Sequence, residues 1–251
     1  MYCGACPLSR FDAMGLEYRY LLDPKKAKEK SEYDHPSRKT PDGKPDKMTN
    51  EEVSKEYCRN HNASIDALKG EANNPRKKNF SLTVDGETTT YSNRQEFLAA
   101  LDKQKATSEV LPEGRQAAER RIKEVAGNSQ KGDQLILETH TTVDDINAKN
   151  PNVIGIRVGG EIVPSAQAGA ELGNAFSNTK ASAVVIGSCL QTQEGVQAIA
   201  NVAGVKVGGS GGKTHPYASA IEGYQEQFAR NVSVEIETPY ARQAYKAVPQ
   251  Q

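Results

Sequence analysis

The sequence predicts an α/β fold with a mostly parallel sheet and helices on both of its faces. Short apolar runs bounded by turn residues alternate with amphipathic runs from residue 134 to near the end of the chain. Several of these apolar runs are continuous, which is typical of strands that are buried on both faces. A polar segment of different composition comes before this pattern, so we expect a largely irregular N-terminal arm in front of the sheet.

The polar segment spans residues 17–79. It is rich in Lys, Glu, Asp, Asn and Pro, and its few aliphatic residues are expected to bury too little surface to offset the entropy of ordering. We therefore predict a polar linker or arm over 17–79 and a compact α/β domain over 80–251. One short helix is expected within the arm, from the capping pattern at Thr49 to Tyr57. The residues of this segment expected to face solvent are His35, Cys58 and His61.

The compact domain is expected to open with a β-hairpin. Phe80–Val84 alternates apolar and polar residues, Asp85-Gly86 is a hairpin turn signal, and Glu87–Tyr91 continues as a Thr-rich strand. A helix capped by Ser92 and a helix over residues 112–127 follow. The later strands are predicted at Gln134–Thr139, Val153–Val158, Ala183–Ser188, Val205–Gly208 and Val232–Ile236. The later helices are predicted at Ser165–Phe176, Thr192–Val202 and Ala218–Ala229.

Two of the predicted strands end in side chains that can take part in catalysis. Gln134–Thr139 is followed by His140, and Ala183–Ser188 is followed by Cys189. Neighbouring strands lie about 4.8 Å apart, and sites in parallel sheets collect at the carboxyl ends of the strands. A thiol is a weak nucleophile until it loses its proton, which a nearby imidazole can accept. We therefore predict that Cys189 is a nucleophile and that His140 is its base.

Two further residues are predicted to support this pair. Gly187 and Ser188 come directly before the cysteine, where they are expected to let the backbone turn sharply and to leave room for a substrate. The backbone N–H group of Cys189 would then point to the place where an oxyanion develops.

This arrangement resembles the caspase-like (clan CD) cysteine peptidases, in which one apolar strand ends in the catalytic His and a second ends in the catalytic Cys. The similarity covers about residues 134–212 and includes the loop and helix between the two strands. Its short motifs are Gly159–Ser165, Ala170–Phe176, Glu194-Gly195 and Gly204–Val207. The family usually has Gly after the His, and the N–H group of that Gly helps to bind the oxyanion. This chain has Thr141 there, so the resemblance implies that the N–H group of Thr141 takes this role, in a hole of different shape. The resemblance implies a caspase-like α/β domain that acts as a cysteine endopeptidase on a protein substrate, without a metal or organic cofactor.

The first sixteen residues, MYCGACPLSRFDAMGL, carry a spaced motif instead of the start of a domain. The residues that match the form Y-x-x-x-N-P-L-x-x-x-D-P-x-G-L are Tyr2, Pro7, Leu8, Asp12, Gly15 and Leu16. Cys6 and Ala13 replace the Asn and the second Pro of that motif. It is similar to the end of the shell-forming core of Rhs/YD-repeat toxins, after which a variable toxic domain begins. Residues 1–16 would then be the remnant of the core, with the self-cleavage of the family falling after Leu16.

The Rhs resemblance also implies how such a chain is used. A toxin of this kind leaves the producing cell through a dedicated export apparatus, such as type VI secretion, without a signal peptide. It acts in the cytoplasm of a rival or host cell. Its implied partners are the parent Rhs core shell, a protein substrate and a cognate immunity protein in the producer.

Charge and composition predict no nucleic-acid, membrane or metal partner. Lys+Arg and Asp+Glu both total 32, so no basic excess favours nucleic acid. No apolar run approaches the roughly 20 residues that span a bilayer. Cys3 and Cys6 form a C-x-x-C pair, but no second pair follows, and no His lies at zinc-finger spacing from it.

Three other sites and one other role remain open. The glycine-rich segment 208–214 follows a strand, but Val207 stands where a P-loop requires its first Gly, so a flexible loop beside the site is expected instead. His215 is an alternative base. Glu235-Ile236-Glu237 imitates the paired glutamates of ADP-ribosyltransferase toxins, although it also fits an edge strand with two outward acids. Finally, Thr141 favours a non-catalytic interaction domain on a caspase-like scaffold.

Overall fold

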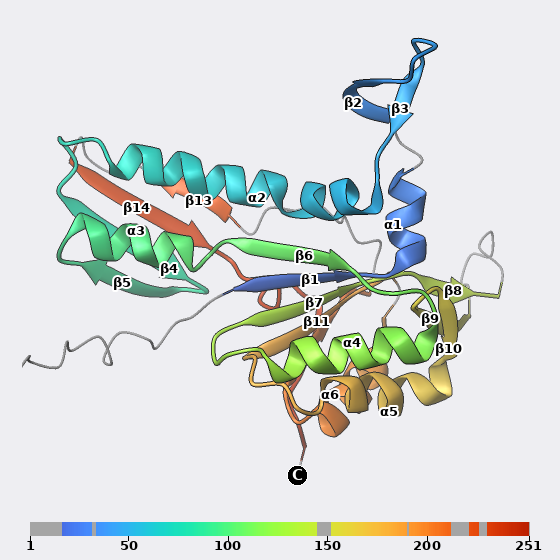
Figure 1. The fold of residues 1–251 in the computed structure, drawn as a ribbon. Helices are drawn as coiled ribbons and strands as arrows, with labels where there is room; N and C mark the ends of the chain where they lie inside the picture. Colours follow the sequence, from blue (N-terminus) through green and yellow to red (C-terminus); the bar gives the residue numbers. More distant parts are fainter. Residues whose placement is uncertain are drawn as a thin grey trace, which may run out of the picture.

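A computed structural model describes residues 17–31, 34–144, 152–189, 191–211, 221–225 and 230–250. Its centre is a six-stranded sheet with the order β15-β12-β11-β7-β1-β6 (Figure 1). Five of these strands run parallel, and β15 pairs with β12 antiparallel. The strands are β1 (Tyr18–Leu22), β6 (Ala106–Val110), β7 (Gln134–Glu138), β11 (Ala183–Gly187), β12 (Lys206–Gly209) and β15 (Tyr245–Ala247). The predicted α/β fold with a mostly parallel sheet is confirmed.

Helices cover both faces of this sheet, as predicted. Three helices lie on one side and the long α2 lies on the other (Figure 1). Successive side chains of a strand point to opposite faces of the sheet. Leu135 and Leu137 therefore pack with the residues of α4, α5 and α6, which form the first layer, and Ile136 packs with the residues of α2 in the second layer. The helices are α4 (Arg115–Gly127), α5 (Ser165–Phe176) and α6 (Gln193–Ala203) on the first face, and α2 (Asn50–Ala72) on the second.

A separate four-stranded sheet extends the second layer, with the order β13-β14-β4-β5. Phe97 of α3 (Arg94–Asp102) stacks on Phe80 with ring centroids 5.2 Å apart, and this contact holds the helix on the sheet. The strands are β4 (Asn79–Val84), β5 (Glu87–Tyr91), β13 (Ile221–Gln225) and β14 (Asn231–Ile236). The predicted hairpin of β4 and β5 is confirmed, and it belongs to this smaller sheet. β14 is an interior strand of the same sheet instead of an edge strand.

A small antiparallel sheet continues from the end of β7. It consists of β8 (Thr141–Val143), β9 (Val153–Val158) and β10 (Glu161–Pro164), with β9 in the middle. The strand predicted at 153–158 therefore exists, but it does not belong to the main sheet. The Asp23 carboxylate accepts a hydrogen bond from the N–H of Gly160 at 2.8 Å, which ties the β9–β10 turn to the end of β1.

The prediction of an irregular arm over residues 17–79 is wrong. β1 lies inside the main sheet, between β7 and β6. The helix expected to start at Thr49 is 23 residues long, with the predicted capping box between Thr49 and Glu52. Cys58 and His61 are 4% and 5% exposed, because they lie on the face of α2 that packs on the sheet. The remaining elements of this segment are α1 (Pro24–Ser31) and the hairpin of β2 (Asp34–Lys39) and β3 (Pro45–Lys47).

The end of the chain differs from the prediction at one element. Residues 221–225 form β13, so the helix expected over 218–229 is wrong there. The rest of that segment, the motif in residues 1–16, Gly212–Thr214 and His215 lie outside the described residues, as does the side chain of His35. Among the described helices, none is both long and apolar enough to cross a membrane.

Candidate active site

The predicted pair His140 and Cys189 lies at the carboxyl ends of two hydrogen-bonded parallel strands. In the register of β7 and β11, Glu138 is the partner of Gly187. His140 and Cys189 each follow two residues after that pair, and both are half-buried. The hydroxyl of Thr141 donates a hydrogen bond to the carbonyl oxygen of Cys189. The two strand ends are therefore in direct contact at the residues that the sequence singled out.

Gln191 joins the same two segments and was not predicted. Its side-chain Nε2 donates to Ser188 Oγ at 2.7 Å and approaches Thr141 Oγ1 at 3.4 Å. Its backbone N–H donates to the carbonyl of Ser210 at 2.8 Å, just beyond β12. Gln191 thus links the ends of three strands around Cys189. A glutamine two residues after a cysteine belongs to no spacing pattern, so the sequence offered no signal for it.

Lys26 of α1 lies buried beneath the pair. Its Nζ donates to the Glu138 carboxylate at 2.6 Å, to the Thr139 carbonyl at 3.3 Å and to the Gly187 carbonyl at 3.1 Å. Both side chains of this ion pair are less than a tenth exposed. One ammonium group therefore fastens the ends of β7 and β11 to each other, directly before His140 and Cys189.

The two residues before the cysteine contact other groups of the protein. Gly187 is the last residue of β11, and a Cβ atom at this position would lie 2.4 Å from the Glu138 carboxylate. The missing side chain therefore makes room for Glu138, while the predicted room for a substrate stays a prediction. Ser188 is completely buried and accepts the hydrogen bond from Gln191. Both residues therefore make contacts inside the protein, Gly187 with Glu138 and Ser188 with Gln191, directly before Cys189.

His140 and Thr141 are held by the small sheet. The N–H of Arg157 donates to the carbonyl of His140 at 3.0 Å, and the Thr139 hydroxyl donates to the carbonyl of Arg157 at 2.5 Å. Successive residues of an antiparallel strand turn their N–H groups to opposite sides. Since His140 faces β9, the N–H group of Thr141 points away from β9.

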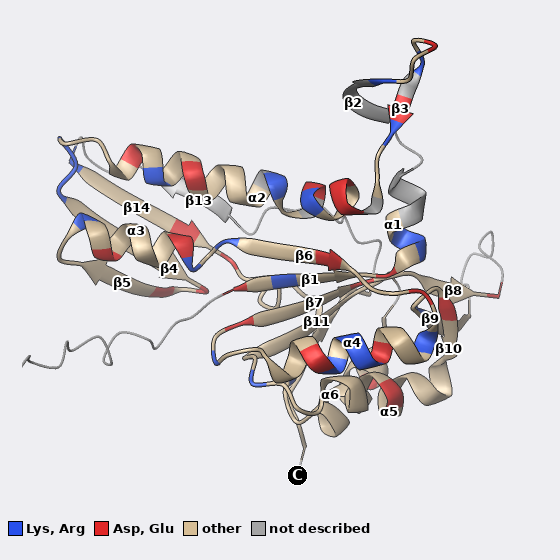
Figure 2. Cartoon of the chain, viewed as in Figure 1, with Lys and Arg blue, Asp and Glu red and all other residues tan. Residues whose placement is uncertain are grey.

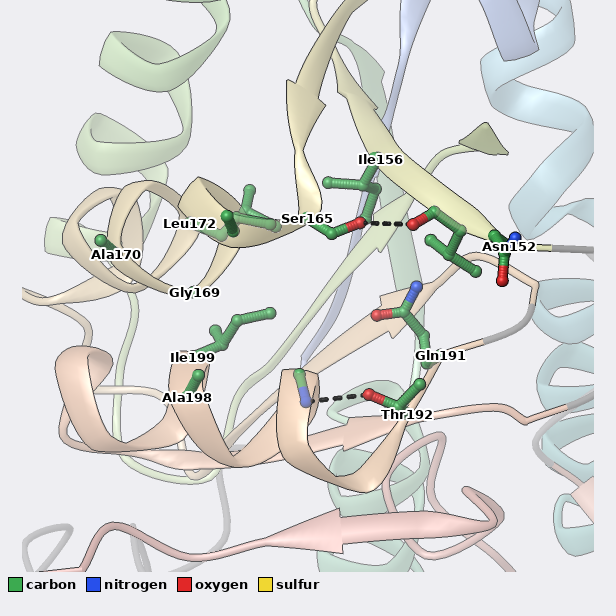
Figure 3. Close-up of a pocket in the computed structure, with 15 residues that line it drawn as sticks. Asn152, Ile156, Ser165, Gly169, Ala170, Leu172, Gln191, Thr192, Ala198 and Ile199 are labelled. Carbon is green, nitrogen blue, oxygen red and sulfur yellow. Dashed lines mark hydrogen bonds between the residues drawn. The ribbon is translucent and has the colours of Figure 1, made fainter. Parts of the chain in front are cut away.

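A cavity of about 510 Å³ lies next to the site, between the N-terminal halves of α5 and α6. The side chain of Gln191 points into it, and Ile156 and Leu172 lie along its wall (Figure 3). None of the described residues that line the cavity is charged. Charged side chains of both signs follow one another along α2 and α4 instead, while α5 and α6 are mostly uncharged (Figure 2).

The rival sites are separated from this one or only partly described. Gly209 ends β12, and the described part of the glycine-rich segment stops at Gly211. Glu235 is exposed on β14, which belongs to the four-stranded sheet and not to the main sheet. The Glu237 carboxylate oxygen Oε2 lies 3.7 Å from Nε of Arg242. Within the described residues, no group of three or more His, Cys, Asp or Glu side chains is arranged to hold a metal ion.

No protein-family model, curated protein or solved structure matches this chain. The function therefore has to be argued from the geometry of the site.

Proposed function

We propose that the chain is a hydrolase that uses a thiol nucleophile. More narrowly, we propose a caspase-like cysteine endopeptidase with Cys189 as nucleophile and His140 as base. The observation that carries the proposal is the hydrogen bond from Thr141 to the Cys189 carbonyl, because it joins the residue after the imidazole to the residue that bears the thiol. Nucleophile and base have to lie within reach of each other for such chemistry.

The arrangement of elements supports the same class. The resemblance to caspase-like peptidases requires the His and the Cys at the ends of neighbouring strands, with a loop and a helix between them. β7 and β11 are parallel neighbours, and the β9–β10 turn and α5 connect them in sequence. In open parallel sheets, the carboxyl ends of the strands are where binding sites collect.

The reaction follows from the two side chains. His140 takes the proton of the Cys189 thiol, and the sulfur attacks the carbonyl carbon of the bond to be cut, so that a C–S bond forms. His140 then gives its proton to the leaving nitrogen as the C–N bond breaks, which leaves a thioester on Cys189. A water molecule, deprotonated by His140, attacks the thioester and releases the acid and the thiol. No oxidant or cofactor takes part.

Two backbone groups are candidates to stabilise the tetrahedral oxyanion. One is the N–H of Cys189 and the other is the N–H of Thr141, which points away from β9. Donors that are fixed before the reaction stabilise developing charge without reorganisation. Thr141 also fixes the backbone of Cys189 through its side chain, which a glycine could not do.

The toxin context rests on the resemblance of residues 1–16 to the end of an Rhs core. In this proposal, the domain is exported with its parent protein and cuts proteins in the cytoplasm of a target cell. A cognate immunity protein protects the producer. The substrate is a protein, and neither a nucleic acid nor a membrane is involved.

The proposal is tested by expressing the chain in a susceptible cell and searching the proteome for new termini. Cys189→Ala and His140→Ala should abolish both killing and cleavage. Cys58→Ala, which removes the buried thiol of α2, should retain both. Killing that consumes NAD and depends on Glu237 would point to ADP-ribosylation. Killing that survives both site substitutions would point to a non-catalytic interaction domain. Either result would refute the peptidase.

A further inference from the structure

We infer that the cavity between α5 and α6 holds an apolar side chain of the substrate, on the side of the cut bond that leaves as the amine. The inference rests on the proposed peptidase function and names the part of the substrate that this site would select. It concerns a region that the sequence did not identify.

The lining of the cavity sets the chemistry of its occupant. Most of the lining residues are small or aliphatic, with Ile156, Leu172 and Ile199 as the larger apolar ones. Four are polar, namely Asn152, Ser165, Gln191 and Thr192, and none of the lining residues within the described part of the chain is charged. A volume of about 510 Å³ lies within the usual range for ligand pockets. An aliphatic side chain would gain free energy by leaving water there, whereas a charged one would lose its hydration without gaining a partner.

Small residues explain why the cavity exists. A Cβ atom at Gly169 would lie 2.7 Å from the Cβ of Ala198, and one at Gly173 would lie 2.4 Å from the Cβ of Val202. The two helices are therefore in close contact along these positions. One turn nearer to the helix starts, Ala166 and Gly195 line the cavity but have too little volume to close it. The cavity therefore results from the packing of α5 on α6, because the residues at the helix starts are too small to fill the space between them.

The cavity begins near the residue that bears the thiol. Gln191 lines it and points into it (Figure 3). Because consecutive Cα atoms are 3.80 Å apart, the Cα of Gln191 lies at most about 7.6 Å from that of Cys189. Ile156, on another wall, is the strand partner of Thr141. A substrate chain bound at Cys189 can thus reach the cavity within about two residues of the cut bond.

The position of His140 assigns the cavity to the leaving side. In the proposed reaction His140 protonates the leaving nitrogen, so the segment that departs lies next to His140 and continues over β8 and β9. Three of the lining residues, Val153, Gly155 and Ile156, belong to β9.

The first test uses a peptide library that varies the three residues after the cut bond. Wild-type protein should prefer Leu, Ile, Met or Val at one of these positions over Asp or Lys by at least about tenfold in kcat/KM. Ala166→Phe, which fills the cavity from an exposed position of α5, should lose most of that preference. Its control is Gln167→Phe, on the next residue of the same helix, which is exposed and does not line the cavity. The control should cleave like wild type.

The second test does not depend on cleavage. Leucyl-leucinamide imitates a leaving segment with its free amino group, and its binding is followed by the NMR signals of the methyl groups of Ala168 and Ala198, which line the cavity and remain in both Phe variants. We expect saturable shifts for this dipeptide in wild type and in Gln167→Phe. We expect none for lysyl-lysinamide or in Ala166→Phe.

The two tests distinguish a failure of the cavity inference from a failure of the proposed peptidase function. Cleavage without a preference after the cut bond, or with equal loss in both Phe variants, overturns the inference and leaves the peptidase intact. A preference confined to residues before the cut bond overturns the assignment to the leaving side. Absence of any cleavage that depends on Cys189 overturns the proposed function, and the dipeptide then decides alone whether the cavity binds apolar peptide ends.

Discussion

The hydroxyl of Thr141 donates a hydrogen bond to the carbonyl oxygen of Cys189. This contact ties the end of β7 to the end of β11. A side chain, and not a bare backbone turn, sets how the residue with the thiol lies against the residue with the imidazole.

Thr141→Val tests this coupling, because it removes the hydroxyl and keeps the shape. Loss of the donor should lower the local opening free energy around Cys189 by about 1 kcal/mol, equivalent to about fivefold faster hydrogen exchange. Hydrogen exchange at Ser188, Cys189 and Gln191 measures this change. Thr141→Ser keeps a hydroxyl and should exchange like wild type. Equal rates in Thr141→Val and wild type would show that the contact has no such effect.

Lys26→Met tests the buried ion pair beneath the site. The substitution leaves the Glu138 carboxylate buried without its partner, so the free energy of unfolding should fall by about 3–5 kcal/mol. Adding Glu138→Gln removes the unpaired charge and should restore at least half of the loss. The exposed neighbour Lys25 provides the control, since Lys25→Met should change stability by less than about 0.5 kcal/mol. Urea titrations give all four values, and a double variant no better than Lys26→Met contradicts the account.

Gly187→Ala tests the space reserved for Glu138. The new methyl group would lie 2.4 Å from the carboxylate oxygen, and the neighbours are themselves buried. We expect a loss of about 1–3 kcal/mol in the free energy of unfolding. Gly127, at the end of α4, has no atom within 4 Å of such a methyl group. Gly127→Ala should therefore leave stability unchanged or slightly raised, and a similar loss in both variants would rule out the steric explanation.

His61 makes stability depend on pH. Burial lowers the pKa of His61 below its ordinary value, while a hydrogen bond to the Gln104 carbonyl opposes that shift. Below about pH 6.5 the unfolded chain takes up a proton that the folded protein still excludes. The stability is therefore fully present above that pH and is lost as the pH falls through the folded pKa, by at most about 1.4 kcal/mol per pH unit. His61→Gln should flatten this part of the curve in urea titrations from pH 7.5 to 5, and parallel curves would contradict the prediction.

The two described cysteines should differ in reactivity. Burial raises the pKa of the Cys58 thiol, whereas Cys189 is half-buried at the edge of the sheet. Iodoacetamide at neutral pH should alkylate Cys189 at least about tenfold faster than Cys58 in the native protein. Peptide mass spectrometry gives both rates, and unfolding in urea should make them similar. Native rates that are already equal would contradict the burial of Cys58.

Elements with a clear pattern could be predicted, and elements with mixed composition could not. β7 and β11 are continuous apolar runs, and α5 was predicted at its observed bounds, 165–176. β1 was missed because Tyr-Arg-Tyr inside a polar segment does not look like a buried strand. Tyr18 is nevertheless fully buried, and its hydroxyl finds a partner in the side chain of Gln104 at 3.0 Å. The polar composition of the segment therefore gave no sign of β1, whose buried tyrosine hydroxyl is paired with the distant side chain of Gln104.

The same limit applies to the support of the site. The pair at the strand ends could be predicted, because each residue follows an apolar run. Lys26 could not, since its partners Glu138 and Gly187 are 112 and 161 residues away. Only the fold brings such groups together. A sequence pattern can thus name candidate reacting groups, while the buried contacts that hold them become visible once the strand order is known.

The entry of the described chain into the main sheet sets Glu17 apart from Cys189. Glu17 is fixed beside Asp133, where its N–H donates to the Asp133 carboxylate at 3.3 Å. Its carbonyl accepts from Gln134 at 3.0 Å. β1 then runs along its parallel neighbour β7 for about 17 Å, five residues at about 3.3 Å each. Glu17 and Cys189 therefore lie at opposite rims of the main sheet, and the thiol cannot reach the backbone of Glu17 in its own molecule.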